Sequence, residues 1–297
     1  MKVRKPIMDR HPGNLTVSVF RGARLALHLC YGLLLAVPYP HLDKSTQRRV
    51  MKSWSKQLLT LLNIGIQIEG QQPPRGEGGC LLVANHVSWL DIYVLNAIHP
   101  AQFIAKSEVR HWPVVGWLAK RCGTIFIERA LRQKTSSINR QIGLLLQQGA
   151  CIGLFPEGTT TDGKQVGHFH SALIQPAIDA GARVHPMVLR YQGENGGPGS
   201  AAAFIGATTL VQSIWRILRC RQLNALVVFT PVLATAGVDR RSLARTAQIA
   251  IALGLQNIGM AHQADEPQAA STLTQAMLSS QSAYALLVDP LLHRLPK

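Results

Sequence analysis

Residues 80–91 read Cys-Leu-Leu-Val-Ala-Asn-His-Val-Ser-Trp-Leu-Asp, and this stretch carries the strongest fold signal in the chain. Its first five residues form a short apolar run, which is typical of a buried strand. The sequence from residue 88 to residue 98 predicts a helix that begins almost directly after that strand. A strand that passes at once into a helix is the basic unit of an α/β fold.

Strands and helices alternate on both sides of this stretch. The predicted strands cover residues 64–69, 80–84, 102–106, 124–127, 151–155, 184–191 and 223–230. The predicted helices cover residues 46–63, 88–98, 113–121, 136–148, 171–180 and 239–255. This order predicts an α/β fold with a mostly parallel, mixed sheet flanked by helices. Ligands of such sheets bind at the carboxyl ends of the strands.

His86 and Asp91 are the residues of this stretch that suggest chemistry. On a continuous helix, residues five apart face different sides, so the two would not meet. We expect the strand-to-helix turn to bring them together, with Ser88 as the N-cap and Asp91 in the first turn. One imidazole nitrogen would face the carboxylate while the other removes a proton from a hydroxyl. Because Ser-x-x-Asp is also a plain capping box, the motif alone leaves a structural role open.

The chain has 297 residues, of which 47% are hydrophobic, and this fits one main domain with attachments. We predict a basic arm over residues 1–14 and a membrane-associated helical segment over 15–66. The main domain is expected over 67–262. A weakly specified tail follows over 263–297.

The predicted membrane segment contains two parts. Residues 25–37 are apolar but are interrupted by His28 and ended by Pro38, so we expect a re-entrant or interfacial segment too short to span a bilayer. A secretory signal peptide is less favoured, because no clear cleavage site follows. The helix over 46–63 is amphipathic and basic. It fits either a membrane surface or the protein's own core with a solvated charged face.

The net charge of the chain indicates which kinds of partner it could bind. Lys and Arg number 31 against 15 Asp and Glu, a formal net charge of +16. Many basic residues flank apolar stretches, as Arg21 and Arg24 do, which suits anionic membrane lipids. No nucleic-acid partner is expected, because the sequence contains no recognisable binding module and no basic surface interleaved with aromatic residues.

The five cysteines, at positions 30, 80, 122, 151 and 220, include no closely spaced pair. The sequence therefore predicts neither a disulfide framework nor a metal site. A reducing, cytosolic environment is the simplest expectation for such a chain.

Three further stretches follow residues 85–91 in order. They are Gly-Thr-Ile-Phe-Ile-Glu-Arg at 123–129, Phe-Pro-Glu-Gly-Thr-Thr-Thr at 155–161 and Val-His-Pro at 184–186. Together the four stretches resemble the ordered motifs of the glycerolipid acyltransferases, the family typified by 1-acyl-sn-glycerol-3-phosphate acyltransferase. The resemblance covers residues 80–190 and implies a glycerol-3-phosphate acyltransferase-like fold, with 67–262 as the acyltransferase domain. The sequence departs from the family at 169–172, where a lysine and a glycine are usual.

The resemblance also implies roles for individual residues. It implies that His86 and Asp91 are catalytic. The substrate-binding residues that it implies are Lys106 and Arg129 for the anionic head group and Glu157, Gly158 and Thr159 for the glycerol-like part of the acceptor. A planar guanidinium can hold a phosphate or carboxylate through two hydrogen bonds, and glycine lets the backbone approach a ligand closely.

We therefore expect a membrane-bound acyltransferase on the cytosolic face of the inner membrane. It would move a fatty acyl group from acyl-CoA or acyl-carrier protein, as co-substrate, to the free hydroxyl of a lysolipid. The first candidate acceptor is 1-acyl-sn-glycerol-3-phosphate, and lyso-ornithine lipid is the alternative, since both present an anion beside a hydroxyl. Neither a cofactor nor a metal ion is expected.

Three rival interpretations are weaker. Residues 158–165 approach a phosphate-binding loop, but Gln165 stands where that loop needs serine or threonine. A serine hydrolase of the Gly-x-Ser-x-Gly type is disfavoured because that motif is absent from the sequence. A non-enzymatic basic protein that binds membranes or nucleic acid would leave all four motifs as coincidence.

Overall fold

The computed structural model describes residues 14–74, 78–127, 132–194, 197 and 199–261. Within them a seven-stranded sheet has the order β1-β7-β6-β2-β5-β3-β4. The strands are β1 (Ile64–Glu69), β2 (Cys80–Ala84), β3 (Gln102–Lys106), β4 (Ile125–Ile127), β5 (Cys151–Leu154), β6 (Arg183–Gly193) and β7 (Leu223–Phe229). Only the β6–β7 pair is antiparallel within this sheet. The prediction of a mixed, mostly parallel sheet is confirmed.

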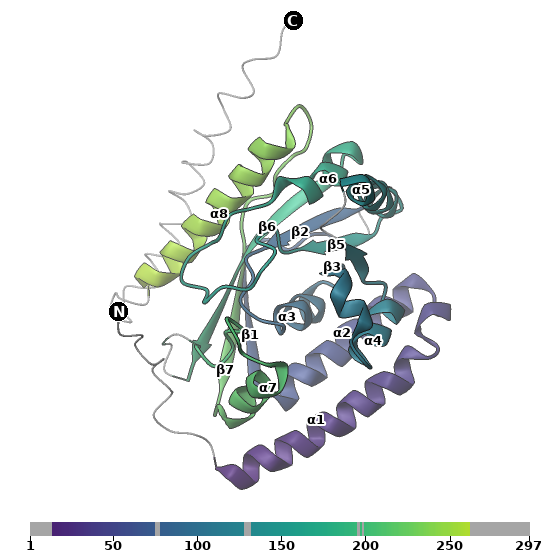
Figure 1. Cartoon of the computed structure of the whole chain (residues 1–297). Helices are drawn as coiled ribbons and strands as arrows, with labels where there is room; N and C mark the ends of the chain where they lie inside the picture. The colour runs from purple at the N-terminus through teal and green to yellow at the C-terminus, as the bar shows by residue number, and fades with distance from the viewer. Residues whose placement is uncertain (1–13, 75–77, 128–131, 195–196, 198, 262–297) are drawn as a thin grey trace, which may run out of the picture.

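Helices cover both faces of the sheet (Figure 1). They are α1 (Leu15–Ala36), α2 (Lys44–Leu61), α3 (Asp91–Ile98), α4 (Val115–Arg121), α5 (Arg132–Gln147), α6 (Gln175–Asp179), α7 (Leu210–Arg219) and α8 (Arg240–Ala261). Short 3-10 turns lie at Tyr39–His41, Ser107–His111 and Ser171–Leu173. The sequence did not predict α7, although Thr209 and Gln212 form a reciprocal capping box at its start.

The strands alternate between two hydrophobic cores. In β2, Leu82 and Ala84 face the core beneath α2, α3 and α7. Leu81 and Val83 face the core beneath α5, α6 and α8. Since all five residues of β2 are buried, this strand lies at the centre of the molecule. The residues that follow β2 are therefore held by packing on both sides.

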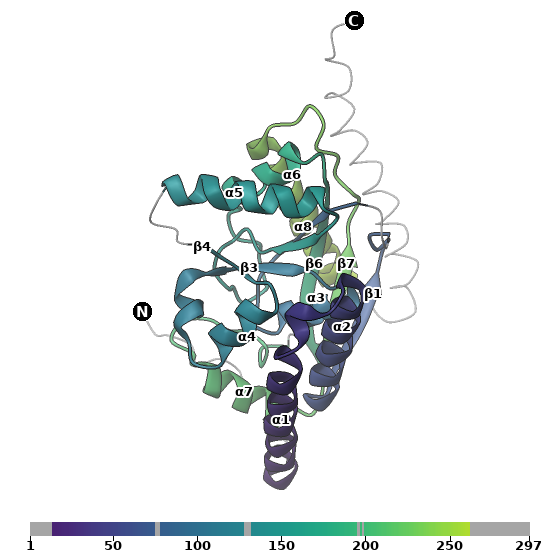
Figure 2. The same ribbon diagram turned by 90° about the vertical axis from the view of Figure 1, so that its right-hand side faces the viewer.

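Helix α1 is longer than the apolar stretch that the sequence predicted. It runs for 22 residues, and in the described part of the chain it is the one helix long and apolar enough to cross a membrane, by length and composition alone. His28 does not interrupt it, because its ring stacks on Trp54 of α2 with centroids 4.7 Å apart. The view in Figure 2 shows α1 extending away from the sheet beside α2.

Helix α2 packs on the protein's own core. Its buried residues include Leu58 and Leu59, which join the same core as β2. It leads into β1, which pairs with β7 from Ile64 onward. The predicted boundary between residues 66 and 67 therefore falls within a strand of the main sheet. Residues 1–13 of the predicted arm (1–14) and the whole predicted tail (263–297) lie outside the described residues.

The carboxyl ends of β2, β3 and β5 reach the same edge of the sheet. The parallel pairing aligns Val83 with Leu154, so the chain after β2 and the chain after β5 emerge side by side. Strand β6 is longer and extends past the end of β2, where Ala84 pairs with Met187. This edge gathers the first and third motifs in one place.

Candidate active site

The side chains of His86 and Asp91 meet just beyond β2, as the sequence predicts. Nδ1 of His86 lies 2.8 Å from Oδ2 of Asp91. The turn itself differs from the prediction, because α3 begins at Asp91 and Ser88 is not its N-cap. The Asp91 carboxylate instead accepts hydrogen bonds from the amides of Val87 and Ser88, at 2.7 and 3.0 Å. It thereby folds the turn back over His86.

Asp91 is completely buried, and four donors surround its carboxylate. Besides the three at Oδ2, the hydroxyl of Tyr191 donates to Oδ1 at 2.8 Å. Burial, and then the charge of Asp91, raise the pKa of Tyr191 well above its usual range, so the phenol stays protonated and keeps donating. A buried carboxylate with every oxygen paired keeps a fixed orientation.

One nitrogen of the His86 imidazole is hydrogen-bonded to Asp91, and the other is available to a substrate. A carboxylate at Nδ1 favours the tautomer that carries its proton there, which leaves the lone pair on Nε2. Within the described part of the chain, Nε2 has no hydrogen-bond partner, and the side chain is 19% exposed. The ring stacks on Phe155, with centroids 4.2 Å apart and planes 9° from parallel.

The third motif fixes the backbone of His86 from both sides. Oε2 of Glu157 accepts the His86 amide at 3.1 Å, and Oε1 accepts the Gly167 amide at 2.8 Å. The amide of Thr161 donates to the His86 carbonyl at 2.8 Å. A loop that follows β5 therefore positions a residue that follows β2.

The residues predicted to bind substrate do not all face solvent. Glu157 is 5% exposed and both its oxygens are taken by backbone amides, so its contacts are those of a positioning residue. Gly158 has φ +68°, a conformation that favours glycine. Thr159 and Lys106 are exposed at the carboxyl edge of the sheet. Arg129 lies outside the described residues.

The fourth motif occupies a different place. Residues 184–186 lie near the start of β6, where His185 pairs in register with Leu82 in the middle of β2. His185 is buried and lines a pocket at the amino ends of the strands, away from His86. Burial, with the charges of His99 and Arg183, lowers its pKa to about 4. The motif therefore contributes to the sheet beneath the site.

Sequence reasoning missed two residues that shape the His86–Asp91 site. Phe155 was quoted only as the start of the third motif, and Tyr191 only as the end of a strand. A signal for Tyr191 does exist, because Met187, Leu189 and Tyr191 alternate on the face that carries Ala84. A tyrosine buried there needs a partner for its hydroxyl.

Replacing Tyr191 with phenylalanine removes one donor from a buried carboxylate. A hydrogen bond to a charged group contributes about 1.5–3 kcal/mol, so we expect the unfolding free energy to fall by about that amount. We also expect kcat to fall about tenfold with little change in KM, because Asp91 orients His86 less firmly. Chemical denaturation and steady-state kinetics measure the two effects. A kcat equal to that of the wild type would show that Tyr191 does not contribute to the orientation of His86.

The Glu157→Gln variant tests whether the third motif positions His86. The amide group of glutamine would face one of the two backbone N–H donors, which leaves a buried donor unpaired at a cost of about 1–3 kcal/mol. We expect at least a tenfold loss of kcat, because small displacements of a catalytic group are costly. Asp162→Asn is the matched control on the same loop, since Asp162 is exposed and its contacts among the described residues are with exposed Lys164. Equal activity of both variants would contradict this role.

The geometry first defines a class of protein. A buried carboxylate orients an imidazole whose second nitrogen is available, at the strand ends of an α/β sheet, where ligands bind. No serine or cysteine in the described ranges is hydrogen-bonded to that nitrogen. An imidazole held in this way can act as a general base toward a hydroxyl group.

Comparisons with known proteins identify the family. Residues 65–190 match the family model described as Acyltransferase. A lyso-ornithine lipid O-acyltransferase from Pseudomonas aeruginosa is 36% identical over 244 residues, which is 80% of this chain and 93% of that protein. A 1-acyl-sn-glycerol-3-phosphate acyltransferase from Neisseria gonorrhoeae is 39% identical over 198 residues, 67% of this chain and 76% of that protein.

A crystal structure shares the fold. The 1-acyl-sn-glycerophosphate acyltransferase of Thermotoga maritima aligns with a TM-score of 0.57 at 20% identity, over 80% of this chain and 98% of that one. The chain belongs to the acyltransferase family, and it is an acyltransferase. The fold class and the family that the sequence predicted are confirmed.

Proposed function

We propose that this acyltransferase transfers a fatty acyl group to the free hydroxyl of a lysolipid, with His86 as general base and Asp91 as the residue that orients it. The hydrogen bond between Nδ1 and Oδ2 carries the proposal, because it leaves Nε2 to face the acceptor hydroxyl. The relatives support a lysolipid as acceptor, since their names specify lysolipids.

The acyl group passes directly from the donor to the acceptor, without being attached to the enzyme. Nε2 of His86 takes the hydroxyl proton as the oxygen attacks the thioester carbonyl of acyl-CoA or acyl-carrier protein. The tetrahedral intermediate collapses, the carbon–sulfur bond breaks, and the leaving thiolate receives the proton from the imidazolium. Asp91 stabilises the imidazolium while it exists. The products are the acylated lipid and the free thiol, and the reaction requires neither an acyl-enzyme, a cofactor nor a metal ion.

We propose that basic residues at the carboxyl edge of the sheet bind the anionic group of the acceptor. Lys106 is exposed where β3 ends. Arg129, which lies outside the described residues, is proposed from the second motif as a further cation for this group. Thr159 and Gly158 would contact the part of the acceptor nearer His86. A phosphate and an amino-acid carboxylate both satisfy this arrangement, so 1-acyl-sn-glycerol-3-phosphate and lyso-ornithine lipid are both retained as acceptors.

Helix α1 is assigned to the membrane interface. Its exposed apolar residues are Leu15, Val17, Val19, Phe20, Leu27, Leu29, Tyr31 and Leu34. Two polar contacts tie the other side of the helix to the protein: Arg21 donates to the Cys220 carbonyl at 2.8 Å, and His28 contacts the Trp54 carbonyl at 3.2 Å. A helix anchored along its length suits lying in the interface of an anionic membrane. We place the site on the cytosolic face of the inner membrane, where acyl-CoA and acyl-carrier protein occur.

The test is an acyl-transfer assay on the purified full chain in lipid vesicles. Each acceptor is supplied in turn with acyl-CoA or acyl-carrier protein, and the acylated lipid is identified by mass spectrometry. We expect product with at least one of the two acceptors, and the higher kcat/KM decides between them. Absence of product from both lysolipids with both donors, in a protein shown to be folded, would overturn the proposal.

A further inference from the structure

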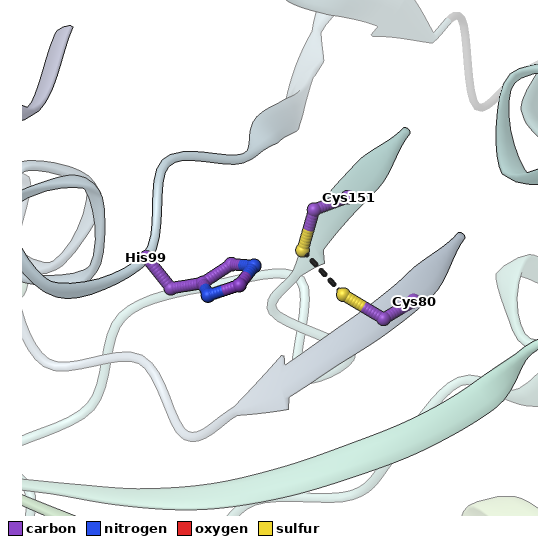
Figure 3. A group of neighbouring side chains, drawn as sticks. All are labelled: Cys80, His99 and Cys151. Atoms are coloured by element: carbon purple, nitrogen blue, oxygen red, sulfur yellow. Dashed lines mark hydrogen bonds between the residues drawn. The ribbon is translucent and has the colours of Figure 1, made fainter. Parts of the chain in front are cut away.

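A second group of reactive side chains lies at the opposite end of the sheet from His86. Cys80 and Cys151 are the first residues of β2 and β5 and are direct partners in the parallel pairing. Their sulfur atoms are 2.7 Å apart. His99, which ends α3, brings its imidazole to the same place, as Figure 3 shows.

The side-chain donor atoms of these three residues all lie within 4.8 Å of one another. In the sequence the two cysteines stand 71 residues apart, which is why no pair was predicted from their spacing. Distance along the sequence did not indicate their distance in space, because the register of β2 and β5 brings the two cysteines together. The acyl-transfer mechanism uses none of the three residues.

Two thiolates and an imidazole form a donor set that zinc prefers. In a tetrahedral site with Zn–S bonds of about 2.3 Å, the two sulfurs would be about 3.8 Å apart. Cys80 and Cys151 would have to separate by roughly 1 Å, which a change of side-chain torsion supplies. The third donor distinguishes this group from a simple cysteine pair, which would need no histidine.

The pocket around Cys80, His99 and Cys151 gives an ion access to their side chains. The three residues line a pocket of about 660 Å³, so an ion can enter and a water molecule can complete a fourth position. Arg48 and Arg183 line the same pocket. Two thiolates neutralise a divalent ion, so the bound ion would add no net charge to a basic region.

We propose that Cys80, His99 and Cys151 bind a thiophilic divalent cation of the Zn²⁺ type, with the fourth position open to the pocket. The ion would join the starts of β2 and β5 to the end of α3. The site is separate from the one that carries His86, so metal content and coordination test it, and acyl transfer is not the readout.

The experiment uses the full chain, purified in detergent under reducing conditions. After loading with Zn²⁺ and desalting, elemental analysis is expected to find one ion per chain. Co²⁺ in its place is expected to give a thiolate-to-cobalt charge-transfer band. Cys80→Ser and Cys151→Ser should abolish both signals, and His99→Ala should weaken binding at least tenfold. Cys30→Ser and Cys122→Ser are the controls, since these cysteines lie outside the group, and both should bind like the wild type.

X-ray absorption on the zinc-loaded wild type keeps the proposal testable if a variant fails to fold. We expect two sulfur ligands at about 2.3 Å and nitrogen or oxygen ligands at about 2.0–2.1 Å. Absence of retained zinc, an oxygen-only coordination shell, or full binding by folded Cys80→Ser would overturn the proposal. A Cys80–Cys151 disulfide in protein isolated under reducing conditions would also overturn the proposal, since it would identify the two cysteines as a redox pair.

Discussion

Replacing His86 with alanine is expected to lower kcat/KM for acyl transfer about 10³-fold. General-base catalysis contributes about 10²–10⁴-fold, and no other described group near the acceptor position is oriented by a buried carboxylate. The variant should fold, because the Asp91 carboxylate keeps the amides of Val87 and Ser88 and the Tyr191 hydroxyl. The measurement is the initial rate of thiol release at lysolipid concentrations well below KM.

His41→Ala serves as the control for this variant. His41 is exposed in the 3-10 turn between α1 and α2, outside the sheet, and its removal should leave the rate unchanged. Circular dichroism and vesicle binding establish that both variants fold and reach their lipid substrate. If folded His86→Ala kept a rate within tenfold of the wild type, His86 would not be the general base.

The Asp91→Asn variant is expected to lower kcat by about 10²–10³-fold, no more than His86→Ala does, while the protein still folds. The asparagine carbonyl can accept the three donors that now meet Oδ2, and its amide can donate to the Tyr191 oxygen. The turn is thereby preserved. A neutral amide, however, does not stabilise the imidazolium that forms when His86 takes the proton.

A combined variant separates this role from a structural one. If Asp91 acts through His86, the double variant His86→Ala/Asp91→Asn should be no slower than His86→Ala alone, because the two residues act as a unit. Thermal unfolding of Asp91→Asn measures the structural contribution independently. Additive losses in kcat, or a loss that only accompanies unfolding, would contradict the role of Asp91 in orienting the base.

The fold was predictable from the sequence wherever the pattern was local. Strands β1, β2 and β3 have the predicted bounds, because each is a short apolar or alternating run between clear breaks. The length of α1 was underestimated because the apolar stretch was taken to begin at residue 25, whereas the helix begins at Leu15. His28 was interpreted as an interruption, whereas in the structure Trp54 covers its ring. A single polar residue in an apolar stretch does not reveal whether a neighbouring helix will cover it.

The sequence indicated which residues form the candidate site, but it did not indicate all of the groups that they contact. That His86 and Asp91 would meet followed from the strand-to-helix turn. Glu157 was expected to contact substrate, but its carboxylate binds backbone amides of the first motif and of residue 167. Contacts between distant segments depend on strand order and register, which one sequence does not specify. The same limitation hid the proximity of Cys80 and Cys151.

The departure from the family at residues 169–172 also has a structural counterpart. Phe169 is buried in the core beneath α5, α6 and α8, and the amide of His170 donates to the Pro156 carbonyl at 2.9 Å. These residues therefore anchor the loop of the third motif to the core. An apolar side chain at 169 fits that function.

The most direct test of the central claim compares two products of one reaction. Wild-type protein in vesicles is mixed with acyl-CoA, with and without the preferred lysolipid, and thiol and acylated lipid are measured together over the first turnover. Direct transfer from donor to a hydroxyl activated by His86 predicts one thiol for each acylated lipid and no thiol without the lysolipid. A burst of thiol equal to the enzyme concentration in the absence of lysolipid would reveal an acyl-enzyme and contradict it.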